Sequence, residues 1–155
     1  MLKIGGCNMD ENLKLENQLC FKVYSASKSI IRMYGPLLNE IDLTYQQYLI
    51  MLVLFENNRL YFKEISSKLK MKTGTLTPIL NKLELNGYLE KIKDENDDRK
   101  IYIAITEKGL NLKNKCKDIP KRIAENLHLG EEEYKEYLKE FNDLVNKLDR
   151  IEKYI

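Results

Sequence analysis

The chain has 155 residues, of which 43% are hydrophobic, so it suits one domain with a buried core. Its net charge of +2 is too small to indicate a nucleic-acid binder by itself. The sequence has no signal-peptide pattern and no apolar run of roughly 18 residues, which excludes a membrane-spanning protein and predicts a cytoplasmic one. The three cysteines lack paired or metal-type spacing, so we expect no disulfide framework, no metal site and no cofactor.

The N-terminal segment, residues 1–12, contains two glycines and shows no periodicity, and we expect it to be a disordered tail. Residues 13–155 are expected to form a single domain. A long helix is predicted from about Leu15 to Tyr34, ending at Gly35-Pro36. One apolar stripe of this helix is formed by Leu15, Leu19, Val23, Ala26 and Ile30.

A second face of the same helix carries a cysteine and two tyrosines. Cys20, Tyr24 and Tyr34 lie at steps that point them the same way. At about 1.5 Å rise per residue, Cys20 and Tyr34 are separated by roughly 21 Å along the axis, so they cannot meet within one chain. They would meet if two copies of the helix ran antiparallel across a two-fold axis. The sequence therefore allows a thiol pocket that a dimer completes.

The next helix is predicted to begin with a capping box from Thr44 to Gln47, which places Tyr45 in its first turn. Three phenols around Cys20, and its position near a helix N-terminus, would stabilise a thiolate and make this cysteine reactive. The alternative is ordinary packing, because single cysteines and helically spaced tyrosines are usually core residues. The residues alone leave both interpretations open.

Residues 65–106 have the pattern of a helix pair followed by a hairpin. A short helix from Ile65 is expected to end in a turn at Met71–Gly74, and Thr73 to Thr75 are good N-caps for a second helix with Pro78 in its first turn. An apolar stripe of this helix packs inward and comprises Leu76, Ile79, Leu80 and Leu83. The polar flank, which we expect to face a DNA groove, comprises Thr73, Thr75, Thr77, Pro78, Asn81 and Lys82.

Gly87 is expected to end that helix, and strands are predicted from Leu89 and over residues 101–106, where isoleucines alternate with other residues. Residues 94–100 form a charged tip between the strands. Arg99 there would enter a minor groove, and Asp97 would hold its guanidinium. A charge run alone is usually a solvated turn, but its attachment to a helix pair favours a wing. The fold class is therefore mainly α (α+β), with a winged helix-turn-helix core at about residues 44–107.

The C-terminal segment also carries an apolar stripe in a charged background. Its members are Tyr134, Tyr137, Leu138, Phe141, Leu144, Val145, Leu148 and Ile151. This spacing predicts a helix that buries one face, either against a partner subunit or within one subunit. We expect dimerisation helices at about residues 15–35 and 107–154, which would make the protein a homodimer.

Several segments together resemble the MarR family of transcription factors, and most closely its organic-hydroperoxide sensors, the OhrR subfamily. These are L-C-F-x-x-Y-S-A-S from Leu19, T-Y-x-Q-Y from Thr44, T-G-T-L-T-P from Thr73, and residues 97–109. The resemblance covers nearly all of residues 13–150. It is far more specific than a generic helix-turn-helix pattern.

The resemblance implies a dimeric repressor that is released from a double-stranded DNA operator by an organic hydroperoxide. It implies that Cys20 is the sensor and that Tyr24, Tyr34 and Tyr45 surround it. The oxidised sulfur would form a mixed disulfide with a low-molecular-weight thiol. Cys116 is the alternative resolving thiol, which would require a Cα separation below roughly 7 Å from its partner.

Two other functions stay open at this point. A MarR-type regulator could instead release DNA on reversible binding of a phenolic ligand, with Cys20 incidental. A thiol peroxidase would need a donor-rich site on a thioredoxin-like scaffold, and because neither is visible we expect no enzyme. The chain also departs from the subfamily, since Lys28 and Lys72 replace an arginine and an acid. The charge pair that would link the sensor helix to the recognition helix is therefore absent.

Overall fold

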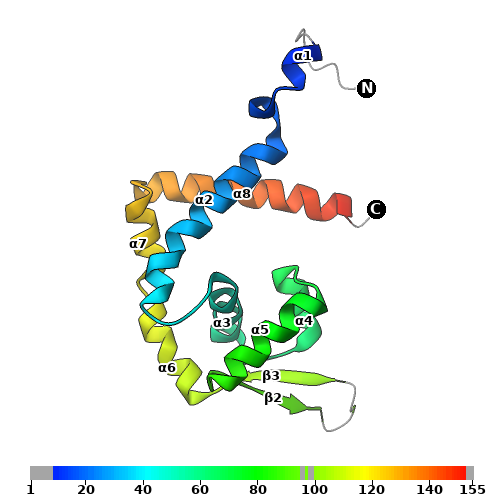
Figure 1. Ribbon diagram of the computed structural model, residues 1–155, viewed down its shortest axis with the longest axis vertical. Coiled ribbons are helices and arrows are strands. Elements are labelled where there is room, and N and C mark those ends of the chain that lie inside the picture. The colour runs from blue at the N-terminus through cyan, green and yellow to red at the C-terminus, as the bar shows by residue number, and fades with distance from the viewer. Residues whose placement is uncertain (1–8, 95–96, 98–99, 153–155) are drawn as a thin grey trace. The chain divides into compact units, whose positions relative to one another are not determined.

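The computed structural model describes residues 9–94, 97 and 100–152 (Figure 1). The chain divides into two compact units, residues 1–110 and residues 111–155, and each is described by itself. The single domain expected over residues 13–155 stays a prediction. Within the expected tail, Met9–Asn12 form a short helix, α1, rather than disordered chain, and residues 1–8 lie outside the described part.

The elements that follow α1 are mostly helical, which confirms the predicted class. They are a 3-10 turn (Leu15–Asn17), α2 (Leu19–Asn39), α3 (Tyr45–Asn57), β1 (Arg59–Tyr61), α4 (Phe62–Leu69), α5 (Thr73–Leu85), β2 (Leu89–Lys93), β3 (Ile101–Ile105), α6 (Glu107–Cys116), α7 (Ile119–Asn126) and α8 (Glu131–Glu152). Among the described residues, no helix is both long and apolar enough to cross a lipid bilayer.

The core of the first unit forms around α3, which is apolar on nearly every side. Fully buried side chains come from α3, α4, α5 and β3, and include Tyr48, Ile50, Met51, Leu54, Ile65, Leu76, Leu80, Leu83 and Ile103. The three leucines of α5 recur at steps of four and three, so they all lie on the face that packs inward. The opposite face of α5 is left exposed.

The sheet has three antiparallel strands in the order β1-β3-β2. Leu60 pairs with Ile103, and Ile92 pairs with Tyr102. The two predicted strands are confirmed, whereas β1 was not predicted because three residues give too short a pattern to detect. Together with α4 and α5, this hairpin confirms the winged helix-turn-helix (Figure 1).

The predicted end of the first long helix is wrong, since α2 continues through Gly35 and Pro36 to Asn39. Leu37 and Leu38 are buried on the added turn, and this packing outweighs the hydrogen bond that Pro36 cannot donate. The helix also begins at Leu19, because the preceding residues form the 3-10 turn.

The start of α5 also differs in detail from the prediction. Lys72, in an extended conformation, is its N-cap, and Thr73 is its first residue, so the predicted threonine caps are wrong. The turn between α4 and α5 lies at residues 70–72, because Lys70 adopts a left-handed conformation (φ 51°) and closes α4. Pro78 consequently lies in the second turn of α5, where it cannot donate to the carbonyl of Gly74.

Two glycines near the base of the wing are required by their surroundings. Gly87 has φ 74° and ends α5 as predicted. Gly109, in the first turn of α6, lies so close to β2 that a Cβ atom there would be 2.1 Å from the carbonyl oxygen of Tyr88. Thr106 joins the two regions, since its hydroxyl donates to Gly87 and accepts from the Gly109 N–H.

Candidate DNA interface and sensor thiol

The exposed face of α5 carries the residues predicted to face DNA. Thr73, Thr75, Thr77, Pro78, Asn81 and Lys82 are all exposed. The preceding turn is held by the Met71 N–H, which donates to the Ser66 carbonyl at 3.0 Å, and by the Ser66 hydroxyl, which donates to the Met71 carbonyl at 2.6 Å. A helix with a buried apolar face and an exposed polar face of this kind is suited to a major groove.

A lysine of the wing strand β2 is bound to the side of α5. The Lys91 Nζ atom lies 2.6 Å from the carboxylate of Glu84 and also donates to the Asn81 side chain. Asn81 was predicted to face DNA, and this contact was not predicted because its partners lie on different elements. Asn81 is therefore part of a link between α5 and the wing, as well as of the exposed face.

A cavity of about 820 Å³ lies where the starts of α4 and α5 approach the wing. Its lining residues are Tyr61, Phe62, Lys63, Glu64, Thr73, Thr77, Asp97, Lys100 and Ile101. Lys63 and Lys100 contribute positive charge, while Glu64 and Asp97 contribute negative charge. The cavity thus lies between α5, which lines it with Thr73 and Thr77, and the wing, which lines it with Asp97 and Lys100.

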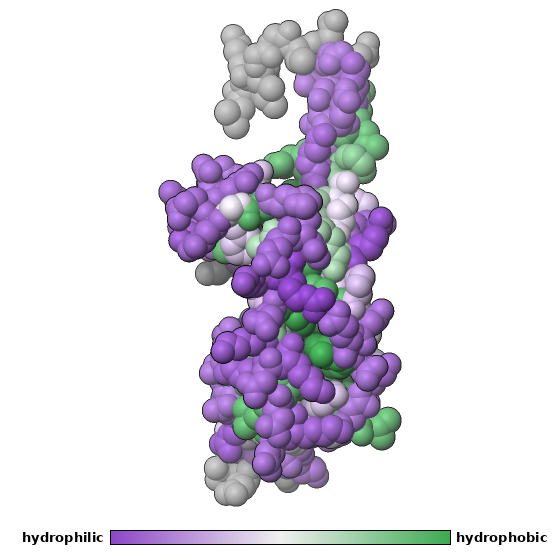
Figure 2. Space-filling model, turned by 90° about the vertical axis from the view of Figure 1, so that its left-hand side faces the viewer, coloured by the Kyte–Doolittle hydropathy of each residue, from purple (hydrophilic) through white to green (hydrophobic). Residues whose placement is uncertain are grey.

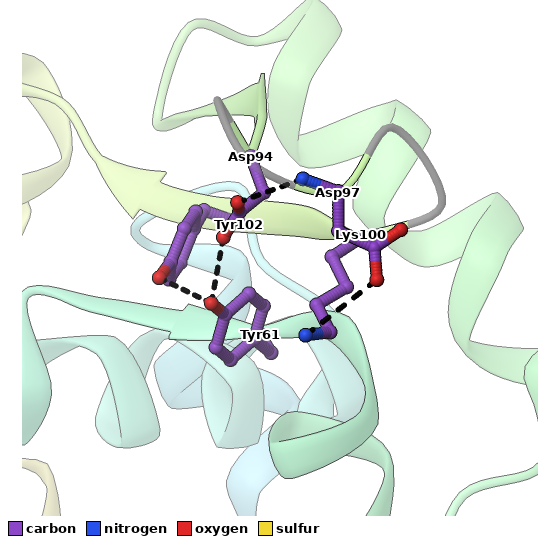
Figure 3. Close-up of polar contacts among 5 residues, drawn as sticks. All are labelled: Tyr61, Asp94, Asp97, Lys100 and Tyr102. Atoms are coloured by element: carbon purple, nitrogen blue, oxygen red, sulfur yellow. Dashed lines mark hydrogen bonds and ion pairs between the residues drawn. The ribbon is translucent and has the colours of Figure 1, made fainter.

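A polar network reaches across this region from β1 to the wing (Figure 3). The Tyr61 hydroxyl donates to the Asp94 carboxylate at 2.7 Å and accepts a hydrogen bond from the Tyr102 hydroxyl. The rings of Tyr61 and Tyr102 are stacked, with centroids 4.0 Å apart. The hydrogen bond from Tyr102, and then that to Asp94, raise the pKa of Tyr61 well above its ordinary value. Nothing in the local sequence indicated this network, because Tyr61 and Asp94 are 33 positions apart.

The predicted contact of Asp97 with Arg99 falls outside the described residues, which do not include Arg99. Among the described residues, Asp97 contacts Asp94 and Lys100. Its N–H donates to the Asp94 carboxylate at 3.2 Å, and its carboxylate lies 3.6 Å from the Lys100 ammonium. Asp97 therefore belongs to the wing, as predicted, and its pairing with Arg99 stays a prediction.

The predicted sensor residues lie in two separate places, one near each end of α2, and Tyr45 at the second place belongs to α3. Cys20 is exposed in the first turn, and Tyr24, one turn later, is 57% exposed. The ammonium of Lys28 donates to the Tyr24 hydroxyl at 3.2 Å. Lys28, which departs from the subfamily pattern, thus contacts a predicted pocket tyrosine directly.

The other two predicted tyrosines meet near the end of α2. The rings of Tyr34 and Tyr45 make an edge contact with centroids 5.1 Å apart, and burial raises the pKa of Tyr45. The ring of Tyr48 lies beside them, with its centroid 5.8 Å from that of Tyr34, although Tyr48 was not predicted as a pocket residue. Its spacing of three from Tyr45 was the available signal. Since α2 is continuous from Leu19 to Asn39, Cys20 stays roughly 21 Å along the axis from Tyr34, as calculated from the sequence.

The predicted capping box at the start of α3 is confirmed. The Gln47 N–H donates to the Thr44 hydroxyl at 3.3 Å, and the Thr44 N–H donates to the Gln47 side chain at 2.8 Å. This cap fixes where α3 begins and so places Tyr45 in its first turn.

Cys116, which was considered as a resolving thiol, is buried, and burial raises its pKa to about 11. A thiol in this state is a poor nucleophile near neutral pH, which disfavours the resolving role considered for Cys116.

Comparisons with known proteins agree on one class. Residues 32–116 match the family of the transcriptional regulators SarA/Rot. The organic hydroperoxide resistance transcriptional regulator of Bacillus subtilis is 41% identical over 116 residues, which make up 75% of this chain and 79% of the relative. Reduced AbfR bound to DNA, from Staphylococcus epidermidis, superposes with a TM-score of 0.78 at 30% identity, covering 93% of this chain and 99% of that one.

NadR in complex with 4-hydroxyphenylacetate is also similar, with a TM-score of 0.67 at 26% identity over 84% of this chain and 92% of that one. All these relatives are transcriptional regulators rather than enzymes. The match to them extends from α2 through the helix-turn-helix and the wing. The chain therefore belongs to the MarR family of winged-helix, DNA-binding transcriptional regulators.

Proposed function

We propose that this protein is a dimeric repressor that leaves its operator when an organic hydroperoxide oxidises Cys20. The observation that carries the proposal is the place of Cys20, exposed in the first turn of the 21-residue helix α2. Its exposure lets a peroxide reach the sulfur. The name of the Bacillus subtilis relative, an organic hydroperoxide resistance regulator, points to the same class of oxidant.

A dimer would complete the pocket that one chain leaves open. The large apolar side chains of Leu19, Val23 and Ile31 remain more than a third exposed along α2. In Figure 2, hydrophobic and neutral surface follows the N-terminal helical segment at the top of the view. A second copy of α2 running antiparallel would cover this face. It would also bring the partner's tyrosine cluster toward Cys20.

The chemistry requires a thiolate and one further thiol. The Cys20 sulfur attacks one oxygen of the hydroperoxide, the O–O bond breaks, and the other oxygen leaves as an alcohol after taking a proton. The resulting sulfenic acid condenses with a low-molecular-weight thiol, which forms a mixed disulfide and releases water. Buried Cys116 is not needed for this step. A thiol reductant cleaves the mixed disulfide and restores the Cys20 thiol.

Oxidation would act on DNA binding through the dimer. Two recognition helices must dock into half-sites roughly one helical turn apart, about 34–36 Å, so a small change in their separation prevents simultaneous docking. A mixed disulfide at Cys20 is too bulky to share a pocket with the tyrosines of the partner, and the subunits must then shift. Release of the operator follows.

The test is operator binding by the wild type and Cys20→Ser before and after treatment with cumene hydroperoxide, on DNA from upstream of the chain's own gene. We expect that only the wild type dissociates and that a thiol reductant restores its binding. Cys116→Ser is the matched control, and it should respond like the wild type. Dissociation of Cys20→Ser on oxidation would refute Cys20 as the sensor.

A reversible phenolic ligand is the second candidate signal. It is favoured by the cluster of Tyr34, Tyr45 and Tyr48 and by the similarity to NadR, which is bound to 4-hydroxyphenylacetate. If such a ligand is the signal, neither the wild type nor Cys20→Ser should leave the operator on treatment with peroxide. The same binding assay with 4-hydroxyphenylacetate would release both the wild type and Cys20→Ser.

A further inference from the structure

Tyr61 connects the first helix of the helix-turn-helix to the wing. It is the last residue of β1 and the N-cap of α4, and its N–H donates to the Glu64 carboxylate at 2.7 Å inside the first turn of α4. Its hydroxyl donates to the Asp94 carboxylate at 2.7 Å, at the point where the chain leaves β2. The backbone of Tyr61 is thus fixed to the helices while its hydroxyl reaches the wing.

Asp94 links the Tyr61 hydroxyl to the backbone of the hairpin. One carboxylate oxygen accepts from Tyr61, and the other accepts from the Asp97 N–H at 3.2 Å. The Asp94 N–H donates to the Lys100 carbonyl at 3.0 Å and continues the ladder beyond the ends of the strands. The direction in which the hairpin leaves the sheet is therefore coupled to the Tyr61 hydroxyl.

The Tyr61 hydroxyl is itself held in one orientation. Its ring stacks on Tyr102, whose hydroxyl donates to it (Figure 3). The guanidinium of Arg59 lies 4.2 Å from the centroid of the Tyr102 ring. Because Tyr61 accepts from Tyr102, its own proton is directed at Asp94. The ordinary pKa of a tyrosine, 10.0, already keeps this proton in place at neutral pH, and the hydrogen bonds of Tyr61 raise its pKa further.

We propose that Tyr61 is a positioning residue for DNA binding, which acts through Asp94 to fix the angle at which the wing meets DNA beside α5. This inference rests on the proposed DNA-binding mode, in which α5 enters a major groove and the wing enters the adjacent minor groove. The geometry of DNA sets the spacing between the two grooves. A wing held at the matching angle before binding loses less conformational freedom on binding, and affinity rises.

The test compares Tyr61→Phe with the wild type on two DNAs. The long DNA contains the operator with its flanking minor-groove segments, and the short DNA is trimmed so that the wing has no groove to enter. We expect Tyr61→Phe to bind the long DNA about fivefold more weakly, because without the hydrogen bond to Asp94 the wing is no longer held at the matching angle before it meets DNA. The short DNA should bind both proteins equally. Tyr88→Phe changes a tyrosine that directly precedes β2 and whose ring contacts Lys108 instead, so it is the matched control and should change neither affinity.

Asp94→Ala supplies the second arm. It should weaken binding to the long DNA at least as much as Tyr61→Phe, and the double variant should be no weaker than Asp94→Ala alone, because both changes break one path. Equal losses on long and short DNA, or wild-type binding by Tyr61→Phe, would overturn the inference. Failure of the wild type to prefer its operator over unrelated DNA would instead refute the proposed function.

Discussion

Replacing Gly109 with alanine tests how tightly α6 is seated against the base of the wing. The added Cβ would lie 2.1 Å from the Tyr88 carbonyl oxygen and 2.7 Å from a side-chain carbon of Ile105. Ordinary carbon–oxygen contacts are about 3.3 Å, so the backbone would have to move by about 1 Å. That carbonyl accepts from the Thr106 N–H at 3.1 Å, and its movement would also disturb the pairing of Leu89 with Ile105.

Overpacking against a backbone atom, which cannot rotate away, should lower the free energy of unfolding by about 3 kcal/mol. For a chain of this length the melting temperature should fall by about 6–12 °C, measured by circular dichroism. Gly130→Ala is the control, because a Cβ at Gly130 meets nothing within 4 Å, and its melting temperature should not change. A Gly109→Ala protein that melts within 2 °C of the wild type would show that α6 is not seated this closely.

Four further outcomes are expected from single sites. Thr44→Ala should cost about 1 kcal/mol of stability because the capping box is lost, whereas Thr44→Ser should stay close to the wild type in denaturant titrations. Iodoacetamide should label Cys20 at neutral pH and spare Cys116; labelling of Cys116 should increase as the pH approaches about 11, read by mass spectrometry. The protonated Cys116 also stabilises the fold below its ordinary pKa of 9.0, so it should contribute a decline in stability between pH 9 and about 11, and Cys116→Ala should make that decline smaller. Leu80→Ala, at a fully buried site, should cost about 3 kcal/mol, and a loss below about 1 kcal/mol would contradict the packing of α5.

Local signals predicted the elements of the helix-turn-helix and the wing. The capping box at Thr44, the leucine spacing of α5 and the stop at Gly87 each act within a few residues of their own position, and each was confirmed. Where distant packing decides the outcome, local rules failed. Burial of Leu38 carries α2 through Pro36, and β1 exists only because β3 pairs with it.

The candidate site divides in the same way. Exposure of the α5 face follows from its periodicity, and so does the separation of Cys20 from Tyr34. The links of Lys91 to Glu84 and of Tyr61 to Asp94 join different elements, and no spacing rule connects such partners. The capping box at Thr44 predicted Tyr45 as a pocket residue, but the contact of Tyr48 with Tyr34 joins two helices and was not predicted.

The two links to the wing differ in what they can contribute to DNA binding. Lys91 lies on β2 opposite the middle of β3, since it pairs with Ile103, and its contacts with Glu84 and Asn81 hold the body of the hairpin against α5. Asp94 lies beyond the last strand pair, so its contact with Tyr61 acts on the tip of the hairpin rather than on its body. Loss of the Lys91 contacts should therefore loosen the whole hairpin and lower stability, whereas loss of the Tyr61 hydroxyl should redirect the tip alone. A binding defect that depends on the length of the DNA, without a change in melting temperature, is thus specific to the second link.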